Sequence, residues 1–331
     1  MGILTVSGSP HIHDRATVPG IMWGVVYALI PAFLVSVWYF GINALILTMI
    51  AAVACMFFEL VIQKYILKTE PDIKDGSAAL TGILLAFNVP ASLPVWQLLT
   101  GCLVSVGIAK MAYGGLGRNI FNPALVGRVF LLISFPVDMT TWPVPKPMTV
   151  IWDGVTGPTS LGILKEGLLK GDSASHISAQ FNNLDIFIGN TAGSLGEVSA
   201  LALILGGVYL LYRRIITWHI PLSYLISVFI FTGIMYLIDP NLYINPLIHV
   251  IVGGLLLGAI YMATDMVTSP MSVKGMLIYG TGCGILTVLI RIWGAYPEGV
   301  SFAILIMNAF TPLINRSFKP KRFGEVLKNV Q

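Results

Sequence analysis

Charged residues are scarce in this chain of 331 residues. Asp, Glu, Lys and Arg make up 10% of it, whereas 56% of the residues are hydrophobic, and the mean hydropathy is +0.84. A soluble domain typically has about 25% charged residues. The composition therefore excludes an ordinary soluble globular protein and indicates an integral membrane protein.

Cysteine is also rare, and its placement excludes several kinds of site. The three cysteines all lie inside apolar runs, and no pair forms a C-x-x-C motif. This pattern gives no support for a zinc site, a disulfide framework or an iron–sulfur cluster held by this chain alone. We expect small buried side chains at Cys55, Cys102 and Cys283.

The chain has no concentrated basic region. Its net charge of +4 comes from residues scattered between apolar segments, a pattern typical of topology signals rather than of a nucleic-acid-binding face. Residues Met1–Ala16 contain no apolar stretch that would form a cleavable signal peptide. We therefore expect a chain embedded in the lipid bilayer, with its first span directing insertion and without nucleic acid as a partner.

The hydrophobic runs predict about ten membrane-spanning helices, each of which needs about 20 apolar residues unless it is broken. The segment Ser77–Val89 is short and is the candidate for a broken helix. The predicted spans are Ile21–Phe40, Ile42–Ile62, Ser77–Val89, Leu93–Ala112, Asn119–Phe135, Gly196–Tyr212, Ile220–Ile238, Ile244–Met262, Gly275–Trp293 and Val300–Ile314.

Basic residues fall almost entirely on one side of these spans, which by the positive-inside rule is the cytosol. Both termini are then cytosolic, and the long loop 136–195 lies outside the cytosol; Arg291 is the exception among the short loops on that side. The cytosolic set is Arg15, Lys64, Lys68, Lys74, Lys110, Arg118, Arg213, Arg214, Lys274, Arg316, Lys319, Lys321, Arg322 and Lys328.

Two short motifs recur in the same order in both halves. Asn119-Ile-Phe-Asn-Pro123 matches Asn308-Ala-Phe-Thr-Pro312, and Gly82-Ile-Leu-Leu85 matches Gly254-Leu-Leu-Leu257. Five spans per half is an odd number, so the halves would be inverted in the membrane. We predict an all-α polytopic membrane protein with a cytosolic arm (1–16), a five-helix repeat (17–135), an extracytoplasmic loop (136–195), a second five-helix repeat (196–316) and a cytosolic tail (317–331).

The long loop contains the segment Asp153-Gly-Val-Thr156-Gly157-Pro158-Thr159. Its hydroxyls lie beside Gly and Pro, which is typical of a turn. The pattern Asp-x-x-(Ser/Thr)-Gly-x-Thr resembles the flavinylation motif of the Rnf complex D subunit and of the B subunit of the sodium-pumping NADH:quinone reductase. The family usually has Ala where this chain has Pro158, and proline stiffens the backbone there.

The resemblance extends from Ser9 to about Arg316, and the chain length favours the Rnf member of the family. It implies FMN bound covalently through a phosphoester to Thr159, with Asp153, Thr156 and Gly157 recognised by a flavin transferase. It also implies a fold similar to that of urea channels and partnership with the A, B, C, E and G subunits of the Rnf complex, especially the flavin-bearing G subunit.

A second candidate site lies at the opposite ends of the helices. The glycine-rich turn Tyr113–Arg118 leads into the fifth predicted span, where a helix N-terminus would offer backbone N–H groups. Asn119 and Asn122 are spaced to share a helix face, although a tight connection between two helices is the favoured explanation of the glycines. The resemblance implies a second, non-covalent flavin, such as riboflavin or FMN, near Asn119, Asn122 and Asp265.

Four charged residues fall inside or at the ends of predicted spans, namely Glu59, Arg128, Glu197 and Arg291. Charges are costly in lipid, so each is expected to pair with another helix or to line an ion path, with pairing favoured. Glu59 is close enough to the span end to reach the surface, whereas Arg128 is in mid-span and needs a partner.

Together these observations predict a membrane flavoprotein subunit of an ion-translocating ferredoxin:NAD oxidoreductase. It would couple electron transfer to Na⁺ or H⁺ movement and catalyse no complete turnover alone. Two alternatives remain: a redox-inactive solute channel or transporter, because inverted repeats with broken helices suit a solute path, and a structural scaffold. Neither gives the flavinylation-like loop a use.

Overall fold

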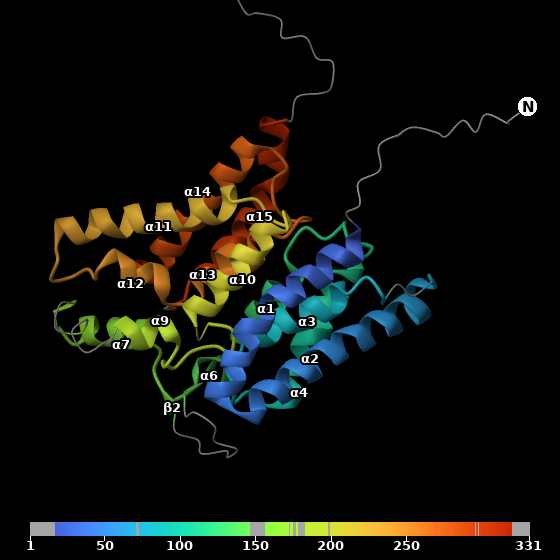
Figure 1. Ribbon diagram of the computed structural model, residues 1–331, viewed down its shortest axis with the longest axis horizontal. Helices are drawn as coiled ribbons and strands as arrows, with labels where there is room; N and C mark the ends of the chain where they lie inside the picture. Colours follow the sequence, from blue (N-terminus) through green and yellow to red (C-terminus); the bar gives the residue numbers. More distant parts are fainter. Residues whose placement is uncertain are drawn as a thin grey trace, which may run out of the picture.

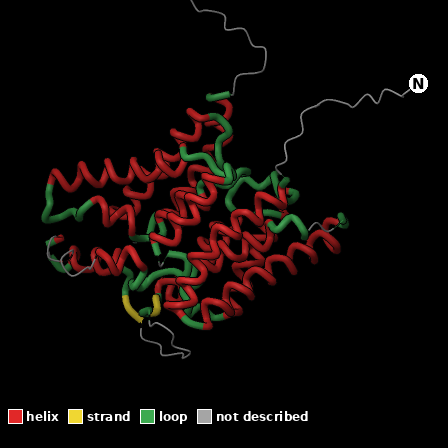
Figure 2. The backbone as a smooth tube through the Cα atoms, viewed as in Figure 1, coloured by secondary structure: helices red, strands yellow, loops and turns green. Residues whose placement is uncertain are grey.

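The computed structural model describes residues 17–70, 73–145, 156–171, 173–174, 177, 183–197, 199–294, 296 and 298–319. Helices account for almost all of the regular structure, and one small two-stranded hairpin joins them (Figure 2). The first half contains α1 (Val18–Phe40), α2 (Ile42–Val61) continued by η1 (Ile62–Leu67), α3 (Ser77–Phe87), α4 (Val95–Leu103) continued by η2 (Val104–Ile108), η3 (Met111–Tyr113) and α5 (Pro123–Ser134).

The segment between the halves contains α6 (Pro136–Thr140), β1 (Trp142–Pro143), β2 (Thr156–Gly157), α7 (Ser160–Leu169) and α9 (Asn183–Ile188). The second half contains α10 (Ala200–Tyr212), α11 (His219–Ile238), α12 (Pro246–Ile251), α13 (Leu255–Leu257) continued by η4 (Gly258–Met262), α14 (Val273–Trp293) and α15 (Val300–Ser317).

Five helical segments of the described chain are long and apolar enough to cross a membrane: Val18–Phe40, Ile42–Leu67, Val95–Tyr113, His219–Ile238 and Val273–Trp293. Three shorter apolar helices, α3, α5 and α10, accompany them. The prediction of a polytopic, mostly helical membrane protein is therefore confirmed.

Two of the predicted spans differ most from the observed helices. The segment Ile244–Met262 is broken: α12 ends at Ile251, and α13 begins at Leu255 after two glycines with positive φ, Gly253 and Gly254. The fifth span begins at Pro123 rather than at Asn119, because the three glycines at 114, 115 and 117 also have positive φ and hold the preceding segment in turns.

The two halves repeat one packing pattern. In the first half α2 contacts α3 and α4, and α4 contacts α5; in the second half α11 contacts α12 and α14, and α14 contacts α15. Figure 1 shows the two groups side by side, the first in blue and green and the second in orange and red. The helices α1 and α10 contact one another between them.

Small residues allow the helices to approach closely where they cross. A Cβ on Gly82 of α3 would lie 2.4 Å from the carbonyl oxygen of Ala51 in α2, and a Cβ on Gly206 of α10 would lie 2.1 Å from that of Ala28 in α1. Helices in lipid gain association energy from such close packing, since lipid is as apolar as the side chains it replaces.

The helix bundle has two distinguishable ends. Helix α1 begins and α15 ends at one of them, which we call the terminal end (Figure 1). The hairpin and α7 lie at the other, which we call the loop end (Figure 1). Because α3 begins at the terminal end and α13 at the loop end, the two short helices enter the bundle from opposite directions.

Candidate functional site

Thr159 lies where the small hairpin passes into α7 at the loop end. Strand β2 pairs antiparallel with β1, with Trp142 opposite Gly157 and Pro143 opposite Thr156. Pro158 follows, and Thr159 is the N-cap of α7. Its Oγ1 accepts a hydrogen bond from the backbone N–H of Gly162 at 3.0 Å. Asp153 lies outside the described residues.

The surroundings of Thr159 differ from those of an exposed turn. Its exposed fraction is 4%, and that of Ser160 is 5%. The segment is buried because α7 packs through Leu161 and Leu164 onto Ile248 and Val252. The Gly-Pro-Thr pattern of residues 157–159 indicates a turn, but the apolar residues that follow it form a short amphipathic helix, which the sequence interpretation missed.

The position of Thr159 suits a phosphate ester. A helix N-terminus favours negative charge because its first N–H groups point outward and the helix dipole is positive there. The first turn of α7 contains no acidic residue that would oppose this. A phosphoester oxygen at Oγ1 could continue to accept the N–H of Gly162, so the residues present fit a covalently attached phosphate.

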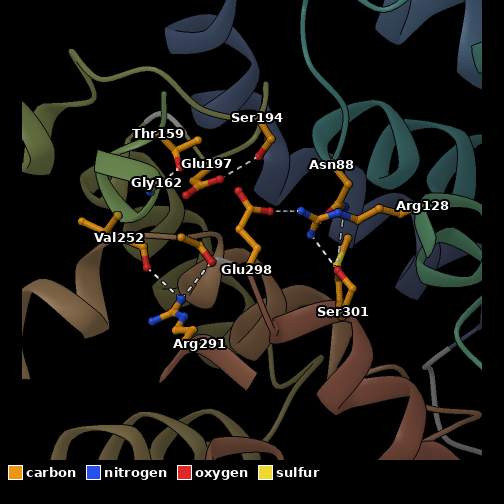
Figure 3. A network of polar contacts seen from close by, with 12 residues as sticks. Asn88, Arg128, Thr159, Gly162, Ser194, Glu197, Val252, Arg291, Glu298 and Ser301 are labelled. Carbon is orange, nitrogen blue, oxygen red and sulfur yellow. Dashed lines mark hydrogen bonds and ion pairs between the residues drawn. The ribbon is translucent and has the colours of Figure 1, made fainter. Parts of the chain in front are cut away.

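A network of charged side chains lies close to Thr159 (Figure 3). Arg128 of α5 donates from Nη1 to Asn88 Oδ1 at 3.0 Å and to Ser301 Oγ at 2.7 Å, and from Nη2 to the carboxylate of Glu298. Glu197 accepts from Ser194 Oγ at 3.1 Å through Oε2. The expectation that Arg128 pairs with a residue on another part of the bundle is confirmed.

Arg291 of α14 lies beside this network, next to the start of α13 (Figure 3). It donates to the carbonyl oxygens of His249, Val252 and Gly253 at 2.6 to 3.0 Å. These carbonyls end α12, so the guanidinium satisfies acceptors that the helix break leaves unpaired. The sequence identified Arg291 as a charge that is costly in lipid. It did not indicate that this side chain would bind the carbonyl oxygens at a helix break.

The second candidate site is a pocket at the terminal end. Asn119, Asn122 and Asp265 all line it, together with residues from the start of α1, and its cavity volume is about 70 Å³. The structure therefore brings together the three residues that were named from the sequence, although Asn119 and Asp265 are 146 positions apart in the chain. This cavity is smaller than typical small-molecule sites, which measure about 300–1,000 Å³.

The two asparagines of this pocket play different parts. Asn122 is the N-cap of α5 and accepts from the N–H groups of Ala124 and Leu125, while its Nδ2 donates to the carbonyl oxygen of Met262 at 3.1 Å. Asn119 precedes the helix, so the two do not share a helix face as predicted. Its Oδ1 is buried and has no partner among the described residues.

Asp265 follows η4 and accepts a hydrogen bond from Thr268 Oγ1 at 3.0 Å. Burial raises the pKa of this carboxyl above its ordinary value, whereas the hydrogen bonds from Thr268 and Val267 oppose the rise. Because Asn122 satisfies the first N–H groups of α5 itself, this helix end offers fewer free donors than the glycine-rich turn suggested.

A buried ion pair lies beside the same pocket and was not predicted. Lys110 Nζ donates to both oxygens of Glu59, at 2.9 and 2.7 Å, and to Ser77 Oγ at 2.6 Å. The side chains of Lys110 and Glu59 are 1% and 2% exposed. The expectation that Glu59 reaches the surface is wrong, because Glu59 is buried. Its partner Lys110 lies 51 residues later in the chain, and no local spacing indicates the pair.

The repeated Asn-x-Phe-x-Pro motif does not mark equivalent positions. Pro123 begins α5, whereas Pro312 lies inside α15. With its amide turned to satisfy its neighbours, Asn308 accepts the backbone N–H of Asn122 at 3.1 Å, so the two motif copies meet. Equivalent residues of two inverted repeats lie at opposite ends of the helix bundle unless they are near the axis that relates the repeats. A better match is Gly76 with Gly254, each of which precedes a short helix with positive φ.

Comparison with known proteins identifies the family. A sequence model of the NQR2, RnfD, RnfE family matches residues 5–324. The chain belongs to this family.

Relatives within the family match this chain over nearly their whole length. It is 43% identical to the D subunit of the Na⁺-translocating ferredoxin:NAD⁺ oxidoreductase complex of Acetobacterium woodii over 323 residues, covering 97% of this chain and 95% of the relative. It is also 43% identical to the proton-translocating counterpart of Clostridium ljungdahlii over 329 residues, covering 97% and 96%. The family resemblance inferred from the motifs is therefore confirmed.

Proposed function

We propose that this chain is the D subunit of an ion-translocating ferredoxin:NAD⁺ oxidoreductase of the Rnf type. In this function it carries FMN on Thr159 through a phosphoester and is one electron-transfer station within the membrane part of the complex. The observation that carries the proposal is the place of the Thr159 hydroxyl, at the N-terminus of α7 within an Asp-x-x-Thr-Gly-x-Thr segment. Family membership supports it.

The protein's own contribution at this site is to hold the phosphate and fix its direction. The N–H of Gly162 and the dipole of α7 stabilise negative charge at Oγ1. The bound flavin would supply one-electron chemistry, and the protein would set its position and potential. Since Thr159 is 4% exposed, a transferase must reach the segment before α7 packs onto α12 or after it opens.

A second flavin, bound without a covalent link, would occupy the pocket of Asn119, Asn122 and Asp265. The unpartnered Oδ1 of Asn119 offers an acceptor to an N–H of a heterocycle. Asp265, with its raised pKa, would be either an acceptor or, when protonated, a donor. Asn122 acts mainly by fixing the start of α5 and the end of η4, and so shapes the pocket rather than offering free polar atoms.

We further propose ten spans in two inverted five-helix repeats, with the terminal end in the cytosol and the loop end outside it. In each half, the basic side chain at the end of the fourth predicted span reaches the start of a short helix in the third, which supports the inversion. Lys110 at the end of the first such helix reaches Ser77, the first residue of α3. Arg291 at the end of the second reaches Gly253, next to the start of α13.

The same function implies the A, B, C, E and G subunits as partners, a flavin transferase, and coupling to Na⁺ or H⁺. Overall similarity does not select the ion, because the relatives named for Na⁺ and for protons are equally similar at 43%. The choice must therefore depend on a few residues or on another subunit.

The contacts between the two short helices favour this function over a solute channel. Asn88, which ends α3, touches Met262, which ends η4, and accepts from Arg128. Ser301 completes the contact from α15. These buried side chains fill the region between the repeats where a solute path would run in a channel of inverted-repeat architecture.

The test is in-gel ultraviolet fluorescence of the denatured subunit, co-expressed with its flavin transferase. The wild type and Ser160→Ala should fluoresce, and Thr159→Val should be dark. Ser160 is a matched control because it is the adjacent, equally buried hydroxyl.

A dark wild-type band, beside another flavinylated subunit that fluoresces in the same cells, would refute covalent flavin on this chain. Measurement of solute flux through the purified protein in vesicles would then test the channel. Fluorescence that persists in Thr159→Val would instead place the flavin on another residue.

A further inference from the structure

Two carboxyl groups face each other beside the α7 N-terminus. Glu197 lies in the segment before α10 and Glu298 in the segment before α15, and Figure 3 shows their carboxyl groups side by side. Glu298 accepts from Arg128 through Oε2, while its Oε1 is buried and has no partner among the described residues. A buried acceptor without a donor is costly, so the arrangement calls for a hydrogen between the two carboxyls.

Glu197 is held against backbone rather than against a cation. A Cβ on Gly193 would lie 3.6 Å from its Oε2, and a Cβ on Gly254, which precedes α13, would lie 3.8 Å from the same oxygen. The hydroxyl that donates to it, that of Ser194, is uncharged. The closest guanidinium groups are occupied elsewhere, Arg128 by Glu298 and Arg291 by three carbonyl oxygens.

A small hollow lies between Glu197 and Ser160, the residue that follows the proposed flavin attachment point. It has a cavity volume of about 10 Å³ and is lined by Ser160, Thr191, Glu197 and Val252, among others. Ser160 directly follows Thr159 and both residues are buried, so negative charge added at Thr159 would act on Glu197 through a region of low dielectric.

We propose that Glu197 and Glu298 are a proton-sharing carboxyl pair that binds one proton from the loop-end water when negative charge arrives at Thr159. The inference rests on the proposed function for its physiological trigger, but the pair itself does not need the flavin. The step is a simple protonation: one carboxylate takes up H⁺, the O–H points at the other carboxylate, and no electron moves within the pair.

The charges around the pair set its working range. Burial and the neighbouring Glu298 raise the pKa of Glu197 to about 7, whereas Arg128, the hydroxyl of Ser194 and Arg291 oppose the rise. These groups come from the segment before α15, from α5, from Glu197's own segment and from α14; the other residues named in the hollow are uncharged. Since the two carboxyls interact, the proton belongs to the pair.

The pair is tested by infrared difference spectroscopy of the full-length chain in nanodiscs during a pH titration. Wild type should show one protonated-carboxyl band, shifted in D₂O, that titrates near neutral pH. The band should be lost in Glu197→Gln and lost or displaced in Glu298→Gln. Glu166→Gln, which removes a carboxyl of α7 outside the pair, should leave it unchanged. A neutral-range band that survives both Glu197→Gln and Glu298→Gln, or no such band in the wild type, would overturn the proposal.

The link to the flavin needs a second comparison. In Thr159→Val, which carries no phosphoester, the band should persist but titrate at lower pH, because a negative charge has been removed. In the flavinylated wild type the flavin midpoint potential should fall with rising pH around neutrality, and this slope should flatten in Glu197→Gln. An equal titration with and without the phosphoester would leave a carboxyl pair but refute its coupling to Thr159.

If the wild type itself carries no flavin, the proposed function fails, whereas the titration of the pair remains a valid measurement. The two ideas therefore fail separately. Fluorescence of the denatured band decides the first, and the infrared band decides the second.

Discussion

The two ends of this helix bundle differ in how their buried carboxylates find hydrogen-bond donors. At the terminal end, each oxygen of Glu59 accepts from Lys110, and the oxygens of Asp75 accept from the N–H of Ser77 at 3.0 Å and from its hydroxyl at 2.5 Å. At the loop end, Glu298 has one oxygen bound to Arg128 and one without a donor among the described residues. A satisfied cluster fixes structure, whereas a half-satisfied one has room for a proton.

The difference follows from which oxygen atoms accept hydrogen bonds from the basic side chains at each end. Lys110 gives its donors to carboxylate and hydroxyl oxygens at the start of α3. Arg291, at the corresponding end of α14, gives its donors to the carbonyls that the break between α12 and α13 leaves free. The break in the second half therefore occupies hydrogen-bond donors of Arg291, which makes no ion pair with Glu197 among the described residues.

The largest expected effect is at the terminal end. Lys110→Met leaves Glu59 charged and buried without its ion pair, and the free energy of unfolding should fall by about 3–5 kcal/mol. The double variant Lys110→Met/Glu59→Gln should recover much of this loss. Denaturant titration read by a thiol-reactive dye would measure it, because all three cysteines are buried until the protein unfolds.

Lys64→Met is the matched control, since Lys64 is exposed and its removal should change stability little. If the double variant were as unstable as Lys110→Met alone, the ion pair would not be the reason for the loss.

At the loop end the equivalent change should cost less. Arg128→Met removes hydrogen bonds to a charged group and to two neutral ones, and the expected loss is about 1.5–3 kcal/mol. It is smaller than at Lys110 because the two glutamates can share a proton once the cation is gone. A loss as large as that of Lys110→Met would remove the distinction between the two ends.

Stability should also depend on pH at the loop end. The pKa of Glu197 is raised in the folded chain to about 7 from an ordinary 4.5, so the folded state holds a proton that the unfolded state has released. The contribution is therefore full below about pH 4.5 and is lost as the pH rises towards 7.

Melting curves of the wild type should show this fall in stability between about pH 5 and 7.5, and Glu197→Gln should flatten it. The comparison needs Glu166→Gln as a control, because a carboxyl of α7 outside the pair should leave the slope as in wild type. A steeper slope in Glu197→Gln would have the wrong sign for a raised pKa.

The smallest effects distinguish a ligand-facing residue from a capping one. Asn122→Ala should destabilise the chain by about 1 kcal/mol through loss of the α5 N-cap. Asn119→Ala removes an oxygen without a partner among the described residues and should leave stability within about 0.5 kcal/mol. If the pocket binds a flavin, Asn119→Ala should still weaken retention of non-covalent flavin, measured by fluorescence of the acid-released cofactor.

The sequence named candidate site residues but did not indicate their contacts. Thr159, Asn119, Asn122 and Asp265 were identified from motifs, because these depend on residue type and local spacing. The buried state of Thr159 was not foreseen, since it results from α7 packing onto α12. The partner of Glu59 was missed because it lies 51 residues away in the chain, and helix periodicity gives no information about contacts over that distance.

The amino-acid sequence by itself determined that this protein is embedded in a membrane, that it is helical and which family it belongs to, because hydropathy and motifs are properties of short segments. The break near Gly253 needed the backbone, whose positive φ values are not fixed by composition. Only the tertiary structure decided which charges are neutralised. That outcome depends on distances between helices. It leaves Lys110 paired with Glu59 at one end, and at the other end Arg128 paired with Glu298 while Glu197 accepts from the uncharged hydroxyl of Ser194.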